Sequence, residues 1–130
     1  MESGSTLTRE MSPEVGDSDD AEDDDRALTC EVSYETGRVI ATVAGELDVE
    51  SAPGLERHLR ALLMLPLDSV TIDLTRLAFM DSSGLSALVR VHQMASELRM
   101  GLSIENPNDR VAWMLDLTRL GATVVSDTTP

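Results

Sequence analysis

Strand-like and helix-like patterns alternate along residues 28–125, and this alternation restricts the chain to one class of fold. The strand-like runs cover 28–34, 38–44, 70–74, 102–105 and 122–125, and the amphipathic helical ones cover 51–65, 83–100 and 109–118. The first two strand-like runs are separated by a short turn at Gly37, which indicates a hairpin. Strands that then alternate with helices predict an α/β domain with a mixed, largely parallel sheet and right-handed crossovers.

Local signals set the expected helix boundaries. Ser51 is predicted to cap the first helix by accepting a hydrogen bond from a first-turn N–H, and Pro66 ends that helix. Gly101 is placed to follow the second helix as its C′ residue. Asn108 or Asp109 is expected to cap the third helix.

Residues 1–26 differ in composition from the rest of the chain. They contain ten acidic and two basic residues, a net charge of −8, and few apolar side chains. Such a segment cannot bury enough surface to offset its conformational entropy. We therefore expect a disordered acidic tail over 1–26 and a single folded domain over 27–128. The tail is interpreted as solvating, with binding to a basic partner or inhibition in cis as the alternative.

The charge and composition argue against several functions. The net charge is −14 and every basic residue is Arg, so phosphate backbones and anionic lipid headgroups repel the chain. We expect no direct binding to nucleic acid or to a membrane. No apolar run approaches the roughly 20 residues that span a bilayer, and the polar N-terminus is not typical of a signal peptide. A cytoplasmic monomer is the default expectation.

The residue pattern gives little support to catalysis. His58 and His92 each occur alone within an amphipathic helix, without a carboxylate that the sequence pairs with them. Cys30, the single cysteine, lies on the apolar face of a strand and is interpreted as a small buried hydrophobic residue rather than a reactive thiol. The sequence has no Cys/His ligand spacing and no glycine-rich phosphate loop. We therefore expect a protein that is not an enzyme and holds no cofactor or metal.

Two strand-to-helix turns are the candidate binding elements. The Gly45–Asp48 turn precedes the first helix, and the Asp81–Gly84 turn, with the sequence Asp-Ser-Ser-Gly, precedes the second. In parallel α/β sheets such turns lie at the carboxyl ends of strands, where ligands and partners commonly bind. If the two strands are neighbours, both turns meet on one rim of the sheet.

Ser82 and Ser83 have two interpretations. Serine is a preferred helix N-cap, and Gly84 relieves crowding where the helix begins. Alternatively, one serine is a phosphorylation site, because a phosphate at a helix N-terminus meets unpaired N–H groups and the positive end of the helix dipole. Phosphate would add about −1.5 to −2 charges beside Asp81 without unfolding the domain. That would switch the affinity for a partner.

The residues of both turns resemble one known family. Phe79–Leu85 with Val70–Leu74, and Gly45–Asp48 with Ala52 and Leu55, are similar to the STAS-domain anti-anti-sigma factors of bacteria. The resemblance covers about residues 28–127, including Leu117–Leu120 before the last strand. It implies a STAS-type single domain with a four- to five-stranded sheet and helices mainly on one face.

The resemblance also implies a partner-switching cycle. The unphosphorylated protein, an anti-sigma factor antagonist, binds an anti-sigma factor, often a serine kinase, and so releases a sigma factor. The kinase phosphorylates the first serine of the turn, and a PP2C-type phosphatase removes the phosphate. The phosphorylation site implied here is Ser82, and the partner-binding residues are Asp48, Ser51, Asp81, Ser82, Ser83 and Gly84.

Two other functions remain open for such a domain. One is a constitutive scaffold or transporter accessory module that phosphorylation does not regulate. The other is a nucleotide-binding domain, against which the absence of Lys and of a phosphate loop argues.

Overall fold

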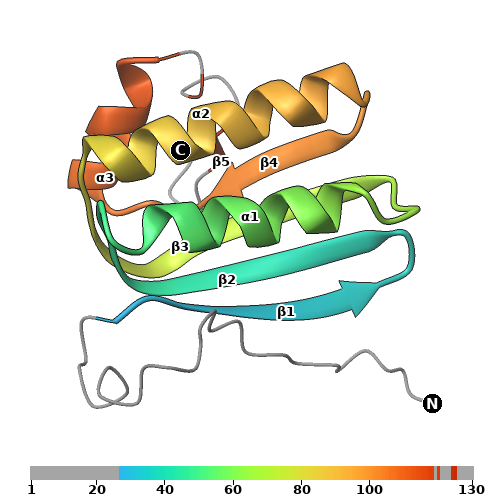
Figure 1. Ribbon diagram of the computed structural model, residues 1–130, viewed down its shortest axis with the longest axis horizontal. Coiled ribbons are helices and arrows are strands. Elements are labelled where there is room, and N and C mark those ends of the chain that lie inside the picture. Colours follow the sequence, from blue (N-terminus) through green and yellow to red (C-terminus); the bar gives the residue numbers. More distant parts are fainter. Residues whose placement is uncertain (1–26, 119, 121–123, 126–130) are drawn as a thin grey trace.

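A computed structural model describes residues 27–118, 120 and 124–125. The predicted disordered tail over 1–26 and the end of the chain over 126–130 lie outside these residues. The elements follow the predicted order (Figure 1): β1 (Thr29–Glu35), β2 (Arg38–Leu47), α1 (Ala52–Leu63), β3 (Ser69–Met80), α2 (Ser82–Glu97), β4 (Gly101–Glu105), α3 (Asp109–Asp116) and β5 (Val124–Val125).

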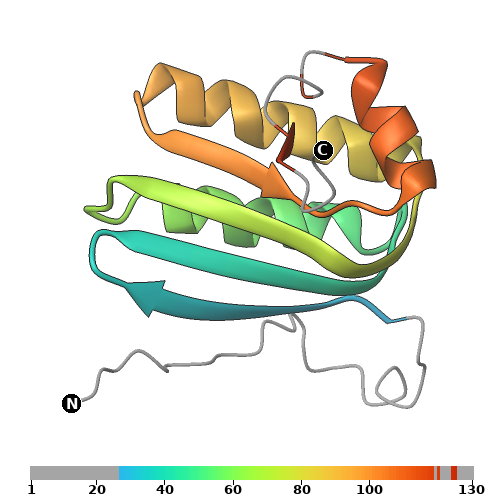
Figure 2. The ribbon, with the colours of Figure 1, turned by 180° about the vertical axis from the view of Figure 1, so that it is seen from behind.

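The sheet has five strands in the order β1-β2-β3-β4-β5. β1 and β2 form the expected antiparallel hairpin, closed by the pair Glu35 and Arg38, and every later pair is parallel. The helices α1 and α2 lie on one face of the sheet, and the view from behind shows the strands in front of both (Figure 2). The α/β, STAS-type fold predicted from the sequence is therefore confirmed, with five strands.

An aliphatic core fills the space between the sheet and these two helices. On the strands, the period-two pattern buries Val39, Ala41 and Val43 completely. On the helices, residues at helical spacing face the sheet, Leu55 and Leu59 from α1 and Leu88 and Val91 from α2. Within the part of the chain that the structure describes, no helix is both long and apolar enough to cross a membrane.

Cys30 contributes to this core from β1. Its side chain is 2% exposed, and burial is the main cause that raises the pKa of its thiol to about 12. The thiol therefore stays protonated at neutral pH, and its interpretation as a small buried hydrophobic residue is confirmed.

The strand β2 is longer than its sequence pattern predicts. It continues through Gly45 and Glu46 to Leu47, where the sequence predicted a turn from Gly45 onward. Gly45 has a φ of +105°, and the pairing of β2 with β3 shifts its register on both sides of this residue. At both shifts the extra residue lies on β3, so bulges in β3 together with the positive φ of Gly45 let the two strands bend and go on pairing, which the sequence pattern alone does not reveal.

The second helix ends earlier than predicted. Its last residue is Glu97, and Arg99, with a φ of +58°, takes the left-handed position that was expected of Gly101. Gly101 instead begins β4, where a Cβ atom would lie 3.2 Å from the Cβ of Ser69 on β3. Leu98, which follows the last residue of the helix, is 45% exposed.

The third helix begins as expected and ends slightly early. Asn108, one of the two predicted caps, accepts a hydrogen bond from the Val111 N–H through its Oδ1 at 2.9 Å. The helix ends at Asp116. In both views, α3 lies near the first turn of α2, at the end of the sheet that carries the candidate site (Figures 1 and 2).

Candidate functional site

The two strand-to-helix turns lie side by side at the carboxyl ends of β2 and β3. These strands are parallel neighbours, and their last residues, Leu47 and Met80, are register partners. The next residue, Asp81, donates its backbone N–H to the carbonyl oxygen of Leu47 at 3.1 Å. Because β2 runs to Leu47, the first turn is Asp48–Ser51 rather than the predicted Gly45–Asp48. This turn and the Asp81–Gly84 turn therefore meet on one rim, as expected for adjacent strands.

Asp81, rather than a serine, is the N-cap of α2. Its Oδ1 accepts hydrogen bonds from the N–H groups of Ser83 at 2.9 Å and Gly84 at 3.2 Å. The prediction that Ser82 or Ser83 caps the helix is wrong, because Asp81 is the last extended residue and its carboxylate lies over the first turn. The negative charge of Asp81 also interacts favourably with the helix dipole.

Ser82 and Ser83 are consequently the first two residues of α2. Ser82 is exposed and Ser83 is half-buried. Among the residues that the structure describes, neither hydroxyl has a hydrogen-bond partner. Because Asp81 caps the helix, both serine hydroxyls are available for contacts outside the domain.

Gly84 allows α2 to begin directly above the ends of the two strands. A Cβ atom at this position would lie 2.6 Å from Cγ of Leu47 and 2.8 Å from Cγ of Met80. Both distances are too short for real contacts. The predicted role of Gly84 in relieving crowding is therefore confirmed, and it fixes how closely Ser82 and Ser83 approach the neighbouring turn.

Asp48 and Ser51 stabilise the other turn. The Oδ1 of Asp48 accepts hydrogen bonds from the N–H groups of Glu50 at 3.0 Å and Ser51 at 3.1 Å. The hydroxyl of Ser51 accepts from the Asp48 N–H and donates to the carbonyl oxygen of Glu46, each at 3.0 Å. Ser51 occupies the N-cap position, as predicted, but its backbone is helical and its side chain makes no capping bond, so the predicted capping hydrogen bond is wrong.

A shallow depression separates the first turns of α1 and α2. Its volume is about 400 Å³, and its lining includes Val49, Pro53, Glu56, Ser82, Ser83 and Arg90. Val49, which follows the Asp48 turn, is 66% exposed although it is apolar. The rim therefore presents serine hydroxyls, one exposed valine and a charged pair within a single surface.

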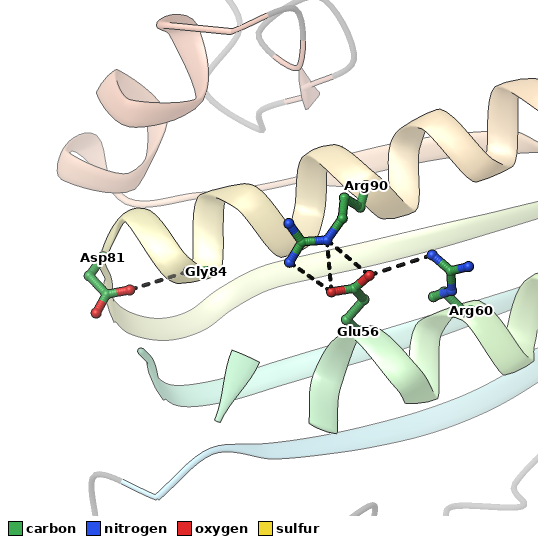
Figure 3. Close-up of polar contacts among 5 residues, drawn as sticks. All are labelled: Glu56, Arg60, Asp81, Gly84 and Arg90. Atoms are coloured by element: carbon green, nitrogen blue, oxygen red, sulfur yellow. Dashed lines mark hydrogen bonds and ion pairs between the residues drawn. The ribbon is translucent and has the colours of Figure 1, made fainter. Parts of the chain in front are cut away.

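The charged pair joins the two helices. Arg90 of α2 contacts Oε1 of Glu56 on α1 through Nε at 3.1 Å and Nη2 at 2.9 Å (Figure 3). Arg60, one turn further along α1, lies 3.5 Å from Oε2 of Glu56. These guanidinium groups, chiefly that of Arg90 through its hydrogen bonds, lower the pKa of the Glu56 carboxyl.

Sequence reasoning missed this pair. The spacing of Glu56 and Arg60 indicates a helical ion pair, but Arg90 is 34 residues from Glu56. That contact depends on how α1 and α2 pack against each other, which no local pattern gives.

A second depression, also missed, lies between the end of β3 and α3. It has a volume of about 450 Å³, and its lining includes Phe79, Arg110, Trp113 and Met114. Phe79 is 41% exposed and Trp113 is 64% exposed. Two of the chain's three aromatic residues therefore lie on the surface, beside the last residues of β3.

The two histidines are not among the residues of the rim. His58 and His92 are half-buried on α1 and α2. In the described part of the chain, no three His, Cys, Asp or Glu side chains are grouped so that they could hold a metal ion.

Comparison with known proteins places these features in a family. The model of the STAS domain family matches residues 30–129. The anti-sigma-B factor antagonist of Bacillus subtilis is 31% identical over 93 residues, which cover 72% of this chain and 84% of that protein.

Solved structures share the fold at lower identity. Unphosphorylated SpoIIAA, an anti-sigma factor antagonist, has a TM-score of 0.67 and 20% identity, covering 76% of this chain and 88% of its own. The phosphorylated form of the same Bacillus protein has a TM-score of 0.64 and 18% identity, covering 76% and 91%. The murine anion transporter Slc26a9 has a TM-score of 0.61 and 14% identity, covering 70% of this chain and 16% of its own.

Proposed function

The chain belongs to the STAS domain family, and from this we propose that it is an anti-sigma factor antagonist, which binds an anti-sigma factor and so releases a sigma factor. The proposal is supported by its similarity to the Bacillus subtilis anti-sigma-B factor antagonist over 84% of that protein's length. A protein acting on such partners would work in the cytoplasm.

The proposed contact surface is the rim formed by Asp48, Ser51, Asp81, Ser82, Ser83 and Gly84. The observation that carries this assignment is that Ser82 is exposed and does not cap the helix. It is exposed at the first position of α2, while Asp81 performs the capping that a serine would otherwise provide. The Asp48 turn is held against it by the pairing of Leu47 with Met80.

We further propose that reversible phosphorylation of Ser82 controls this contact. The partner would then be a serine kinase as well as an anti-sigma factor, and a PP2C-type phosphatase would restore binding. Asp81 already occupies the N–H groups of Ser83 and Gly84, so a phosphate on Ser82 adds charge next to an existing carboxylate. A surface fitted to a neutral hydroxyl loses affinity for this turn without any change of fold.

The decisive experiment has two stages. The protein is isolated from its native cells, and its phosphate is mapped by peptide mass spectrometry before and after treatment with a PP2C-type phosphatase. The anti-sigma factor that co-purifies with it is then titrated against the wild type, Ser82→Asp and Ser96→Asp. Ser96 is an exposed serine in the last turn of α2 and provides a control of equal charge.

The proposal predicts a phosphatase-sensitive phosphate on Ser82. It also predicts at least about tenfold weaker binding by Ser82→Asp, equivalent to about 1.4 kcal/mol, with no comparable loss in Ser96→Asp. Binding that is indifferent to Ser82→Asp, together with an unmodified Ser82 peptide, would instead favour a constitutive scaffold or transporter accessory module.

A further inference from the structure

Arg90 lies in the same depression as Ser82. Both residues line the hollow between α1 and α2, and Arg90 is the basic residue among those that line it. Figure 3 shows its guanidinium leaning from α2 toward α1 and toward the end of the helix that Asp81 caps. Helical side chains generally point toward the N-terminus of their helix, so this direction is the relaxed one.

We propose that Arg90 binds the phosphate carried by Ser82, so that phosphorylation exchanges the Glu56–Arg90 bridge between two helices for a bridge within α2. The inference rests on the proposed phosphorylation of Ser82. It adds that a side chain of the same domain, Arg90, binds the phosphate. It also explains how the modification would alter α1, through loss of the bridge to Glu56.

Two backbone N–H groups of the turn are not available to the phosphate. An anion at a helix N-terminus ordinarily binds the first N–H groups. In this chain Oδ1 of Asp81 already accepts from Ser83 and Gly84. The neighbouring carboxylate also repels a phosphate, so the new charge is driven toward the depression, where Arg90 lies.

The two side chains are within reach of each other. Ser82 and Arg90 are eight residues apart, which is about 12 Å along the helix axis. The long arginine side chain points back along this axis toward Ser82, and both residues line the same depression. The side chain of Arg90 is 52% exposed, so it can turn from Glu56 toward the phosphate without crossing the core.

The exchange is favoured by charge. A phosphate carries about −1.5 to −2 charges and accepts a bidentate guanidinium, whereas Glu56 offers a single negative charge. The side chain of Glu56 is only 16% exposed, and after the exchange it retains Arg60 at 3.5 Å as its partner. A mostly buried carboxylate that has lost its stronger partner is expected to move toward solvent. Phosphorylation would therefore change the surface of α1 beside the rim as well as the turn itself.

The test places the phosphate without a kinase. Phosphoserine is incorporated at position 82 during expression, and the second pKa of its phosphate is measured by phosphorus NMR. A nearby guanidinium stabilises the dianion and lowers this pKa. Arg90→Gln is therefore expected to raise it by about 0.5 unit, roughly a threefold change in the proton affinity. Arg99→Gln removes the same charge at the far end of α2 and is expected to leave it unchanged.

Two further variants keep the result interpretable. Glu56→Gln removes the competitor for Arg90, so it is expected to lower the pKa of the phosphate on Ser82. Phosphoserine at position 86 stands one helical turn before Arg90, where an ion pair forms readily, and its pKa should also depend on Arg90.

The proposal is overturned if Arg90→Gln leaves the pKa of the phosphate on Ser82 unchanged while that on Ser86 responds. It is equally overturned if neither phosphate responds, because Arg90 then does not leave Glu56. Either result contradicts only the binding of the phosphate by Arg90. The titration of the anti-sigma factor against Ser82→Asp decides separately whether Ser82 controls partner binding.

Discussion

Asp81, which caps α2, donates its backbone N–H to the carbonyl oxygen of Leu47, the last residue of β2, at 3.1 Å. The start of the helix is therefore tied to the neighbouring strand as well as to its own. This bond holds the two turns of the rim together, and Gly84 lets the helix approach closely enough for it to form. The arrangement of the proposed contact surface thus depends on how closely Leu47, Asp81 and Gly84 pack together.

Gly84→Ala is expected to destabilise the domain. The added Cβ would clash with Leu47 and Met80, and overpacking of this kind costs about 1–3 kcal/mol. Urea denaturation followed by circular dichroism measures the loss. Gly54→Ala in α1 is the matched control and should stabilise the domain by up to about 1 kcal/mol, since alanine favours a helix. Equal stability of Gly84→Ala and the wild type would contradict the close packing described.

Asp81→Ala is expected to lower stability through the loss of a helix cap. The carboxylate accepts two backbone hydrogen bonds, and such caps contribute about 0.5–2 kcal/mol. Asp81→Asn should retain most of this contribution, because its side-chain oxygen also caps. Ser82→Ala and Ser83→Ala should change stability by less than about 0.5 kcal/mol, as expected for residues without a capping role. A larger loss in either serine variant than in Asp81→Ala would reverse this assignment of the cap.

The sequence predicts the order of elements well because the aliphatic periods are strong. The alternation in β1 and the helical stripes of α1 and α2 each agree with local propensity. The cap of α2 was misassigned because Asp81, Ser82 and Ser83 are all good capping residues. Which of them caps the helix depends on where β3 ends, and its pairing with Leu47 sets that end at Met80.

The candidate site was only partly predictable for a similar reason. The two turns are visible as short motifs, and their meeting follows once the strands are neighbours. The Glu56–Arg90 pair and the depression beside Trp113 arise from tertiary packing of segments distant in sequence. The roles of Ser82 and of the rim in partner binding stay predictions.

Trp113→Ala is expected to leave stability almost unchanged. The indole is 64% exposed, so its removal should cost less than about 0.5 kcal/mol, whereas removal of the fully buried Leu115 on the same helix should cost about 2–5 kcal/mol. Thermal unfolding of the two alanine variants compares them directly. A large loss in Trp113→Ala would mean that the indole supports the fold, in conflict with its exposure.

Cys30 is expected to make stability fall at alkaline pH. Its pKa is raised from 9.0 to about 12 in the folded protein, so the folded state keeps a proton that the unfolded state loses. The contribution is complete below pH 9 and decreases as the pH rises toward 12. Urea denaturation across this range should show a steeper decline for the wild type than for Cys30→Ala. Parallel pH profiles would show that the thiol is not protected by burial.

The Glu56–Arg90 pair is expected to give a small, pH-dependent coupling. A double-mutant cycle with Glu56→Gln and Arg90→Gln should yield about 0.3–1 kcal/mol at pH 7, because the arginine is half exposed and solvent screens the charge. The pKa of Glu56 is lowered from 4.5 in the folded state, so the contribution is present above this value and disappears as the pH falls through the lower, folded pKa. Repeating the cycle with Arg99→Gln in place of Arg90→Gln should give no coupling. If the coupling persisted in acid, where Glu56 is protonated, the attraction between α1 and α2 at this point would come from packing of the side chains rather than from charge. A phosphate on Ser82 would then have little charge attraction to replace at Arg90.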